Sequence, residues 1–411
     1  MPDPTDNTAE NAATFAQRVR RARERKGMTR AAAAARVGRS YEWWKAIETG
    51  RLRMPRLPML MRMAELLDVA SLADLTGDDR VTASTYRNTA HPALQRVRGA
   101  LTTYSFQAAD TAPPPADALT ARVRQAWQLW HGIGDHRTHV ADVLPGLLAD
   151  LQHASRALDG TARRQALVAL AETYHLAQLY LSFQPAPELV MLTGDRAMAA
   201  AQDADSPHAI AGAAWYMNHV YRDAGEAHEA RVELAMMASE LLCRDRGEED
   251  TARWGMLHLA AALSYAKVGQ KGSAEYHWDK ADDAARALGD AYSHPYLIFG
   301  RGMVDAYRLT IDVDLVQSGA AVDDAANLDL SRVPSATRRG FHAIESARAY
   351  SLAGEDVAVV HFLNQANQLS PETARYNLFA RSTVADLVES GPAALRPTAR
   401  ALAREWAVPA A

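Results

Sequence analysis

Tyrosines recur at a nearly constant interval through much of this 411-residue chain. The intervals are 41, 44, 42 and 43 residues, counted between Tyr180, Tyr221, Tyr265, Tyr307 and Tyr350. In three copies a glycine stands four positions later, at Gly225, Gly269 and Gly354. A period of this length within an apolar helical pattern is typical of stacked helical hairpins. We therefore predict an all-α chain with five such hairpins in an α-solenoid over residues 119–405, with residues 119–160 as a capping helical pair.

The N-terminal part of the chain has a different charge. Residues 15–56 contain thirteen Lys or Arg and three Glu, about +10, whereas the whole chain is -4. The residues after position 56 consequently sum to about -11. A basic module ahead of an acidic array predicts two different partners, and nucleic acid is the partner that the basic module favours.

Capping residues divide this basic module into short helices. Residues 14–26 form an amphipathic stretch that ends at Gly27. Thr29 can cap a second, alanine-rich helix that Gly38 breaks, and Ser40 can cap a third. We predict a helix-turn-helix bundle over residues 14–72, preceded by a disordered tail (1–13) and followed by a connector (73–118).

The entry Gly-Met-Thr, the small-residue helix, Val-Gly, Ser40 and the segment Ile-Glu-Thr-Gly-Arg ending at Arg51 resemble the Xre and lambda-repressor-like helix-turn-helix family. The resemblance implies that the helix after Ser40 lies in the major groove of double-stranded DNA, with some side chains at base edges and others at phosphates. The implied DNA contacts are Arg30, Arg39, Ser40, Tyr41, Glu42, Lys45, Arg51 and Arg53. It also implies a buried, structural salt bridge between Arg23 and Glu48. Trp43 either packs in the bundle or contacts DNA.

The repeat frame resembles the tetratricopeptide repeat, although its period is longer than usual. A helix-turn-helix followed by such an array resembles peptide-responsive regulators of Gram-positive bacteria and Xre-type actinobacterial regulators. The resemblance implies a concave groove that binds a signalling peptide, as in quorum sensing. Groove positions in this frame are Tyr174, Gln178, Trp215, Asn218, His219, Arg222, Arg301, Asp305, Arg308 and Arg348. The arginines favour an anionic ligand, unless they form salt bridges within the array.

No motif for catalysis, metal binding or a cofactor is present: we find no HExxH, P-loop or G-x-S-x-G, and the histidines are dispersed. We therefore expect no enzyme activity and no cofactor. The polar N-terminus does not resemble a signal peptide, no apolar run is long enough to span a bilayer, and the lone Cys243 excludes an internal disulfide. We expect a cytoplasmic protein without membrane contact, and we expect Cys243 to be a small core residue.

These features lead to one hypothesis and one alternative. The hypothesis is a homodimeric transcription regulator that binds an operator through its helix-turn-helix and whose repeat domain senses a peptide or small anionic ligand. The alternative is an interaction adaptor whose repeats bind a partner protein and whose DNA contact is weak or constitutive.

Overall fold

The computed structural model describes residues 14–55, 57–69, 71–77, 89–104, 111–224 and 227–408. Throughout these residues the regular structure is helical and contains no strand, so the predicted all-α class is confirmed. The tail at residues 1–13 and the turn glycine Gly225, both singled out from the sequence, lie outside the described residues.

The basic N-terminal module folds into short helices around its own core. Its elements are α2 (Phe15–Arg25), α3 (Arg30–Arg36), α4 (Tyr41–Glu48), α5 (Leu57–Leu67) and α6 (Leu72–Thr76). The side chains of Thr14, Thr29 and Ser40 each accept a hydrogen bond from a backbone N–H of the following first turn, as predicted for the second and third. Trp44 and Ile47 share the buried face of α4. The helix-turn-helix bundle therefore forms where the caps placed it.

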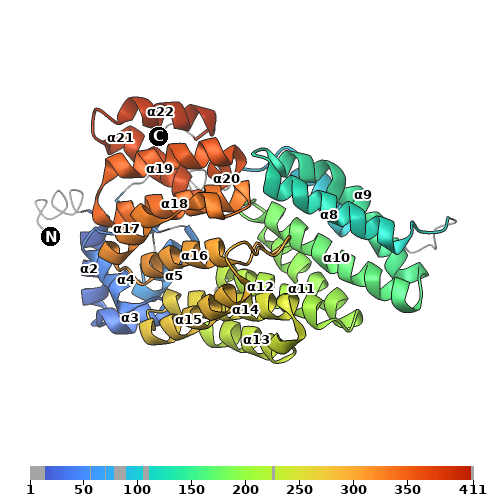
Figure 1. Cartoon of the computed structure of the whole chain (residues 1–411). Coiled ribbons are helices and arrows are strands. Elements are labelled where there is room, and N and C mark those ends of the chain that lie inside the picture. The colour runs from blue at the N-terminus through green and yellow to red at the C-terminus, as the bar shows by residue number, and fades with distance from the viewer. Residues whose placement is uncertain are drawn as a thin grey trace, which may run out of the picture.

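The rest of the chain forms an array of helical hairpins (Figure 1). The five hairpins are α10 (Gly160–Leu181) with α11 (Pro187–Asp203), α12 (Pro207–Ala224) with α13 (His228–Glu240), α14 (Glu248–Lys267) with α15 (Lys271–Leu288), α16 (Arg301–Asp314) with α17 (Ser318–Asn327), and α18 (Ala336–Ala353) with α19 (Asp356–Leu369). The repeating tyrosines lie on the first helix of each hairpin. The tyrosine period thus corresponds to one hairpin.

Further helices flank the five hairpins. Before them come α7 (Leu94–Thr102), α8 (Ala116–Gly132) and α9 (His136–Ala157), and after them α20 (Pro371–Tyr376), α21 (Leu378–Ser390) and α22 (Arg396–Glu405). The predicted capping pair is α8 with α9. Among the described helices, none is both long and apolar enough to cross a bilayer.

The hairpins pack closely because small residues lie where their helices cross. A Cβ on Gly255 of α14 would overlap Ala284 of α15 and the ring of Phe299. Gly269 and Gly354 end α14 and α18 in the left-handed region, with φ of +78° and +81°, where a residue with a Cβ is strained. These glycines are required by the crossing and by the turns.

The array bends so that its end meets its beginning. Helix α20 packs beside the α8–α9 turn, where Pro371 contacts Gly134. His131 of α8 hydrogen-bonds through Nδ1 to Ser335 Oγ (2.8 Å), just before α18. The beginning of the array is therefore joined to α20 and to the segment before α18.

Cys243 is exposed, so the expectation of a core cysteine was wrong. Helix α13 ends at Glu240, and Cys243 belongs to the irregular segment before α14 rather than to the apolar helical run.

Candidate nucleic-acid interface and ligand pocket

One part of the predicted DNA-contact set forms an open, charged face on α4 and the turn after it. The ring of Tyr41 is 45% exposed, and Lys45 Nζ lies 6.0 Å from its centroid. Glu42 is ion-paired with Lys45 (3.6 Å) and with Arg51 (3.9 Å). These pairs are exposed and weak, so phosphates or base edges can displace them. Tyr41, Glu42, Lys45 and Arg51 are therefore available to DNA.

Glu48 is the buried centre of the bundle's polar network. Arg23 donates to it from Nε (2.5 Å) and Nη2 (3.1 Å), as the predicted salt bridge requires. Arg30 Nε (2.6 Å) and Trp44 Nε1 (2.7 Å) also donate to Glu48. Burial opposes ionisation, but these donors outweigh it and lower the pKa of Glu48. Arg30, predicted to contact DNA at a phosphate or a neighbouring base, is thus held by Glu48 in this structure.

The other predicted DNA residues face the array. Ser40 is only 6% exposed, because the turn at Gly269 lies directly against it: a Cβ on Gly269 would overlap Ser40 Cβ. Arg53 donates to Asp386 (3.1 Å) and Asp356 (3.3 Å), both on the C-terminal repeats. The N-cap of α4, at the end of the helix that the family resemblance places at base edges, is consequently covered, whereas Tyr41 and Glu42 in the first turn stay exposed.

Arg39 lies at the same contact, beside a buried charge cluster. Asp314 accepts hydrogen bonds from Lys267 Nζ (2.7 Å) and Arg348 Nη2 (3.1 Å). Burial opposes ionisation of Asp314, but the two cations hold the pKa of Asp314 well below its usual range. Burial lowers the pKa of Arg39, and the charge of Asp314 opposes that shift. Asp314 thus attracts Arg39, which was predicted to contact DNA.

Apolar side chains complete the contact between bundle and array. Ala46 is fully buried there, and Trp43 and Leu52 pack partly buried beside it. Their partners on α16–α18 and the following turns are Leu309, Val313, Val316, Ala321, Ala325, Leu328, Ala349, Tyr350 and Leu352. Trp43 was predicted either to pack in the bundle or to contact DNA. In the structure it packs, both within the bundle and against the array.

The predicted groove residues of α10 and α12 are largely built into the array. Tyr174, Gln178, Trp215 and Asn218 are all buried. Gln178 Nε2 donates to Tyr216 O (2.9 Å), and Asn218 Nδ2 donates to Arg231 O (2.8 Å). Burial also lowers the pKa of His219 well below its usual value. Their assignment as ligand contacts stays a prediction, and it requires the helices to move.

The predicted groove arginines of the later repeats already hold carboxylates. Arg301 pairs with Asp282 and with Asp305 (3.1 Å), and Arg348 pairs with Glu345 (2.6 Å) and Asp314. Arg308 pairs with Asp312 (3.1 Å) and Glu275 (3.7 Å). Arg222 lies nearby and its charge lowers the pKa of His219. To bind at Arg301, Arg308 or Arg348, an anionic ligand would have to displace the acidic residue that is already paired with that arginine.

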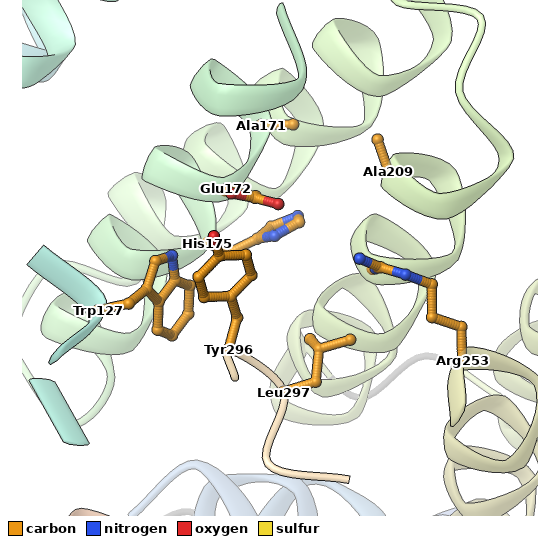
Figure 2. A pocket seen from close by; sticks show the side chains of 9 residues that line it. Trp127, Ala171, Glu172, His175, Ala209, Arg253, Tyr296 and Leu297 are labelled. Atoms are coloured by element: carbon orange, nitrogen blue, oxygen red, sulfur yellow. The ribbon is translucent and has the colours of Figure 1, made fainter. Parts of the chain in front are cut away.

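A recess that the sequence did not reveal lies elsewhere in the array (Figure 2). The recess is small, with room for about one water molecule, and part of it is open to solvent. Its lining comes from α8, α10, α12, α14 and the loop before α16, namely Trp127, Ala171, Glu172, His175, Ala209, Gly212, Arg253, Tyr296 and Leu297. These positions are distant in sequence and belong to no motif, so only the folded arrangement brings them together.

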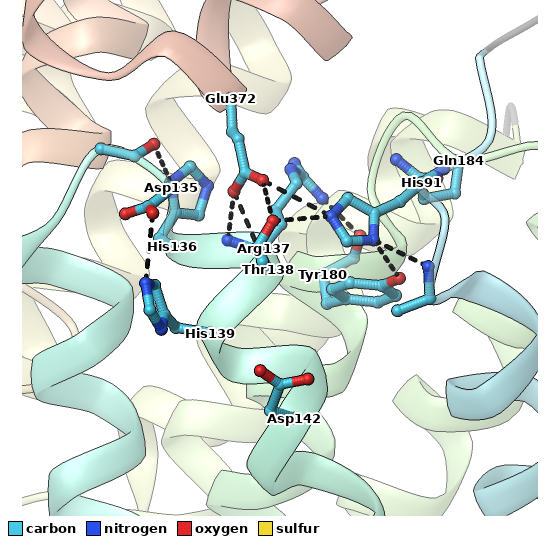
Figure 3. A network of polar contacts seen from close by, with 12 residues as sticks. His91, Asp135, His136, Arg137, Thr138, His139, Asp142, Tyr180, Gln184 and Glu372 are labelled. Carbon is cyan, nitrogen blue, oxygen red and sulfur yellow. Dashed lines mark hydrogen bonds and ion pairs between the residues drawn. The ribbon is translucent and has the colours of Figure 1, made fainter.

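A polar network near the connector joins α20 to the beginning of the array (Figure 3). Glu372 of α20 accepts from Thr138 Oγ1 (2.6 Å) and lies 3.4 Å from His91 Nε2. His91 Nδ1 meets the hydroxyl of Tyr180 at 3.0 Å, and the backbone N–H of His91 donates to Gln184 (2.6 Å). Segments more than two hundred residues apart are thereby tied together.

Residues 14–88 match a family described as "Helix-turn-helix domain". The match covers the N-terminal bundle, whose caps, turns and buried Arg23–Glu48 pair are described above. No curated protein and no solved structure matches the chain. The bundle is therefore a helix-turn-helix domain, which supports a DNA-binding regulator.

Proposed function

We propose that this protein is a sequence-specific transcription regulator whose repeat array controls access of its helix-turn-helix domain to operator DNA. The observation that carries the proposal is the contact of Ser40 with Gly269. A helix-turn-helix of this type places the first turn of its recognition helix in the major groove. DNA and the array therefore compete for the same end of α4.

The covered state is held by contacts of moderate strength. Arg53 bridges two carboxylates, Asp356 and Asp386, at a partly exposed site, and such pairs contribute about 0.2 to 1 kcal/mol each. The apolar contact at Ala46 and Trp43 adds burial. Release of the bundle requires a ligand or DNA to supply a comparable free energy, since a ligand shifts an equilibrium only by its differential affinity.

In this proposal the array senses an effector, a signalling peptide or a small molecule, and passes the signal to α4. The protein works in the cytoplasm as a homodimer on a pseudo-palindromic operator, because helix-turn-helix proteins commonly bind two half-sites one helical turn apart. The arginine pairs described above weaken the case for an anionic effector, since the array already neutralises most of them.

The adaptor remains the second candidate, and the exposed face of α13 favours it. Met237 and Leu241 are 62% and 45% exposed there, and adjacent exposed apolar side chains can mark a protein contact. In that case the repeats bind a partner protein, and DNA binding does not depend on the array.

Gly269→Ala and Gly354→Ala provide a matched test in the full-length protein. Both place alanine at φ near +80°, but only the Cβ at position 269 meets Ser40; the space beside Gly354 is open. We expect Gly269→Ala to tighten binding to DNA from upstream of the protein's own gene, measured by fluorescence anisotropy at fixed salt, and Gly354→Ala to leave it unchanged. Equal affinities for wild type and Gly269→Ala would refute control by the array, and no binding by any of the three would favour the adaptor.

A further inference from the structure

The recess lined by α8, α10, α12 and α14 contains a carboxylate without a partner. Glu172 has neither a hydrogen bond nor an ion pair among the described residues, although it is only partly exposed. Figure 2 shows its carboxylate beside His175, across the recess from Arg253. A partly buried carboxylate without a counter-charge is costly unless a ligand supplies that charge.

Arg253 does not fill this role. Its Nε donates to Glu249 (2.8 Å), its Nη2 lies 2.7 Å from the same carboxylate, and its Nη1 donates to His208 O (2.8 Å). The positive charge at this wall is therefore balanced by Glu249. The uncompensated charge of the recess is negative and resides on Glu172.

The remaining walls are aromatic and carry unused polar atoms. The rings of Trp127 and Tyr296 lie 5.9 Å apart, and His175 stacks on Tyr216 at 4.5 Å. Trp127 Nε1 and His175 Nε2 are both buried and lack a hydrogen-bond partner in the described part of the chain. Apolar pockets with a few convergent polar groups are the usual form of small-molecule sites, and aromatic faces attract cations.

We propose that this recess binds the ammonium group of a small amine, which pairs with Glu172, while the carbon atoms next to it contact Trp127 and Tyr296. The absence of a side chain at Gly212 keeps the recess open, since a Cβ there would lie 3.2 Å from Arg253 Nη1 and 3.5 Å from His175 Cε1.

The recess is connected to the covered end of α4 through α14. Arg253 lies near the start of this helix and Lys267 ends it, so roughly 21 Å of continuous helix separates them. Lys267 binds Asp314, and Gly269 in the following turn touches Ser40. A ligand that displaces the start of α14 thus acts on the turn that covers the DNA-reading helix. The role of the amine as effector rests on the function proposed above, whereas its binding does not.

Calorimetric titration of the full-length protein with phenethylamine tests the site without DNA. Its neutral and anionic analogues, 2-phenylethanol and 3-phenylpropionate, separate the ammonium contribution from apolar packing. We expect phenethylamine to bind at least tenfold more tightly than either analogue. Glu172→Gln should weaken that binding at least tenfold, whereas Glu240→Gln, an exposed glutamate on α13, should not change it. Failure of phenethylamine to bind, or equal binding to Glu172→Gln, would overturn the assignment.

Gly212→Ala provides a second variant, because it fills the recess and leaves Glu172 in place. We expect it to weaken phenethylamine binding several-fold with an unchanged circular-dichroism spectrum, and unchanged binding would contradict the location of the site. DNA binding is then measured with and without saturating phenethylamine. An amine that binds without changing DNA affinity refutes its role as effector and leaves the site standing. If Gly269→Ala changes DNA affinity but phenethylamine does not bind, the amine site is refuted, whereas control of DNA binding by the array is not.

Discussion

Ser40 and Gly269 touch, although they belong to the DNA-reading module and to a turn of the third hairpin. Ser40 caps α4 through a hydrogen bond from Trp43 N (3.0 Å) to its Oγ, so the contact lies at the end of the helix that we propose enters DNA. The left-handed conformation required at Gly269 and the close approach to Ser40 both exclude a side chain there. One glycine thus serves the turn and the contact.

Removal of the carboxylates that hold Arg53 should favour DNA binding. In Asp356→Asn combined with Asp386→Asn, Arg53 loses two partly exposed ion pairs and is released to a phosphate. We expect DNA affinity to rise by about 2- to 20-fold. Asp283→Asn, at an exposed position of α15, is the control and should bind as wild type. An unchanged affinity in the double variant would show that these pairs do not restrain the bundle.

Base-reading and phosphate-binding residues should differ in their effects. Replacement of both Tyr41 and Glu42 by alanine should reduce the difference in affinity between operator and unrelated DNA. Arg51→Ala should weaken binding to all sequences to a similar extent and reduce the slope of log affinity against log salt by about 1. Both are measured by anisotropy over a series of salt concentrations. Loss of base preference in Arg51→Ala alone would reverse our assignment.

Glu48→Gln should destabilise the helix-turn-helix domain. It removes a carboxylate that accepts from Arg23, Arg30 and Trp44 and leaves the buried Arg23 with only the half-exposed Glu24 (3.4 Å) as a counter-charge. Loss of one partner of a buried pair costs about 3 kcal/mol. Hydrogen exchange of the amides in α2–α4 reports this domain separately from the array. Glu65→Gln, at an exposed position of α5, should leave the exchange rates unchanged.

Glu172 should make the stability of the array pH-dependent. Burial raises the pKa of Glu172 to about 7, against the charge of Arg253. The folded state therefore keeps a proton that the unfolded state releases, and the resulting stability is present below pH 4.5 and lost as pH rises through 7. Arg253, Glu249 and Arg124 also act on Glu172. In the folded protein neither Glu249 nor His175 titrates in this window, because the pKa of Glu249 is lowered to about 2 and that of His175 to about 3.

Urea unfolding at pH 5 and pH 8 measures this effect. We expect the wild type to lose about 1 to 3 kcal/mol more than Glu172→Gln over this range, since the recess is partly open to solvent. The same pH dependence in both proteins would show that Glu172 is not the responsible group.

Local features of the sequence predicted much of this fold. Thr29, Gly38 and Ser40 set the helices of the N-terminal bundle because capping and left-handed turns depend on a few adjacent residues. The tyrosine period predicted the hairpins because each repeat packs mainly on its neighbours. The helical pair predicted at residues 119–160 is present as α8 and α9.

The docking of the bundle and the recess were not predictable in the same way. Arg39 and Arg53 look like phosphate contacts by charge and position, and nothing near them in sequence indicates that Asp314 or Asp386 will meet them. Similarly, Glu172 and Tyr296 become neighbours only when α10 and the loop before α16 are stacked. Such contacts depend on how successive hairpins are rotated, and the repeat period does not specify that rotation.

The bond network at Glu372 has a mechanical consequence. In an open solenoid, a change in the tilt of one helix can be accommodated by movement of the free end of the array. Here Thr138 and His91 hold Glu372 of α20, so α20 cannot move independently of α9. A displacement of α9 is therefore expected to reach α18, whose Ala349 and Leu352 contact the helix-turn-helix bundle, by way of α20 as well as through the hairpins in between.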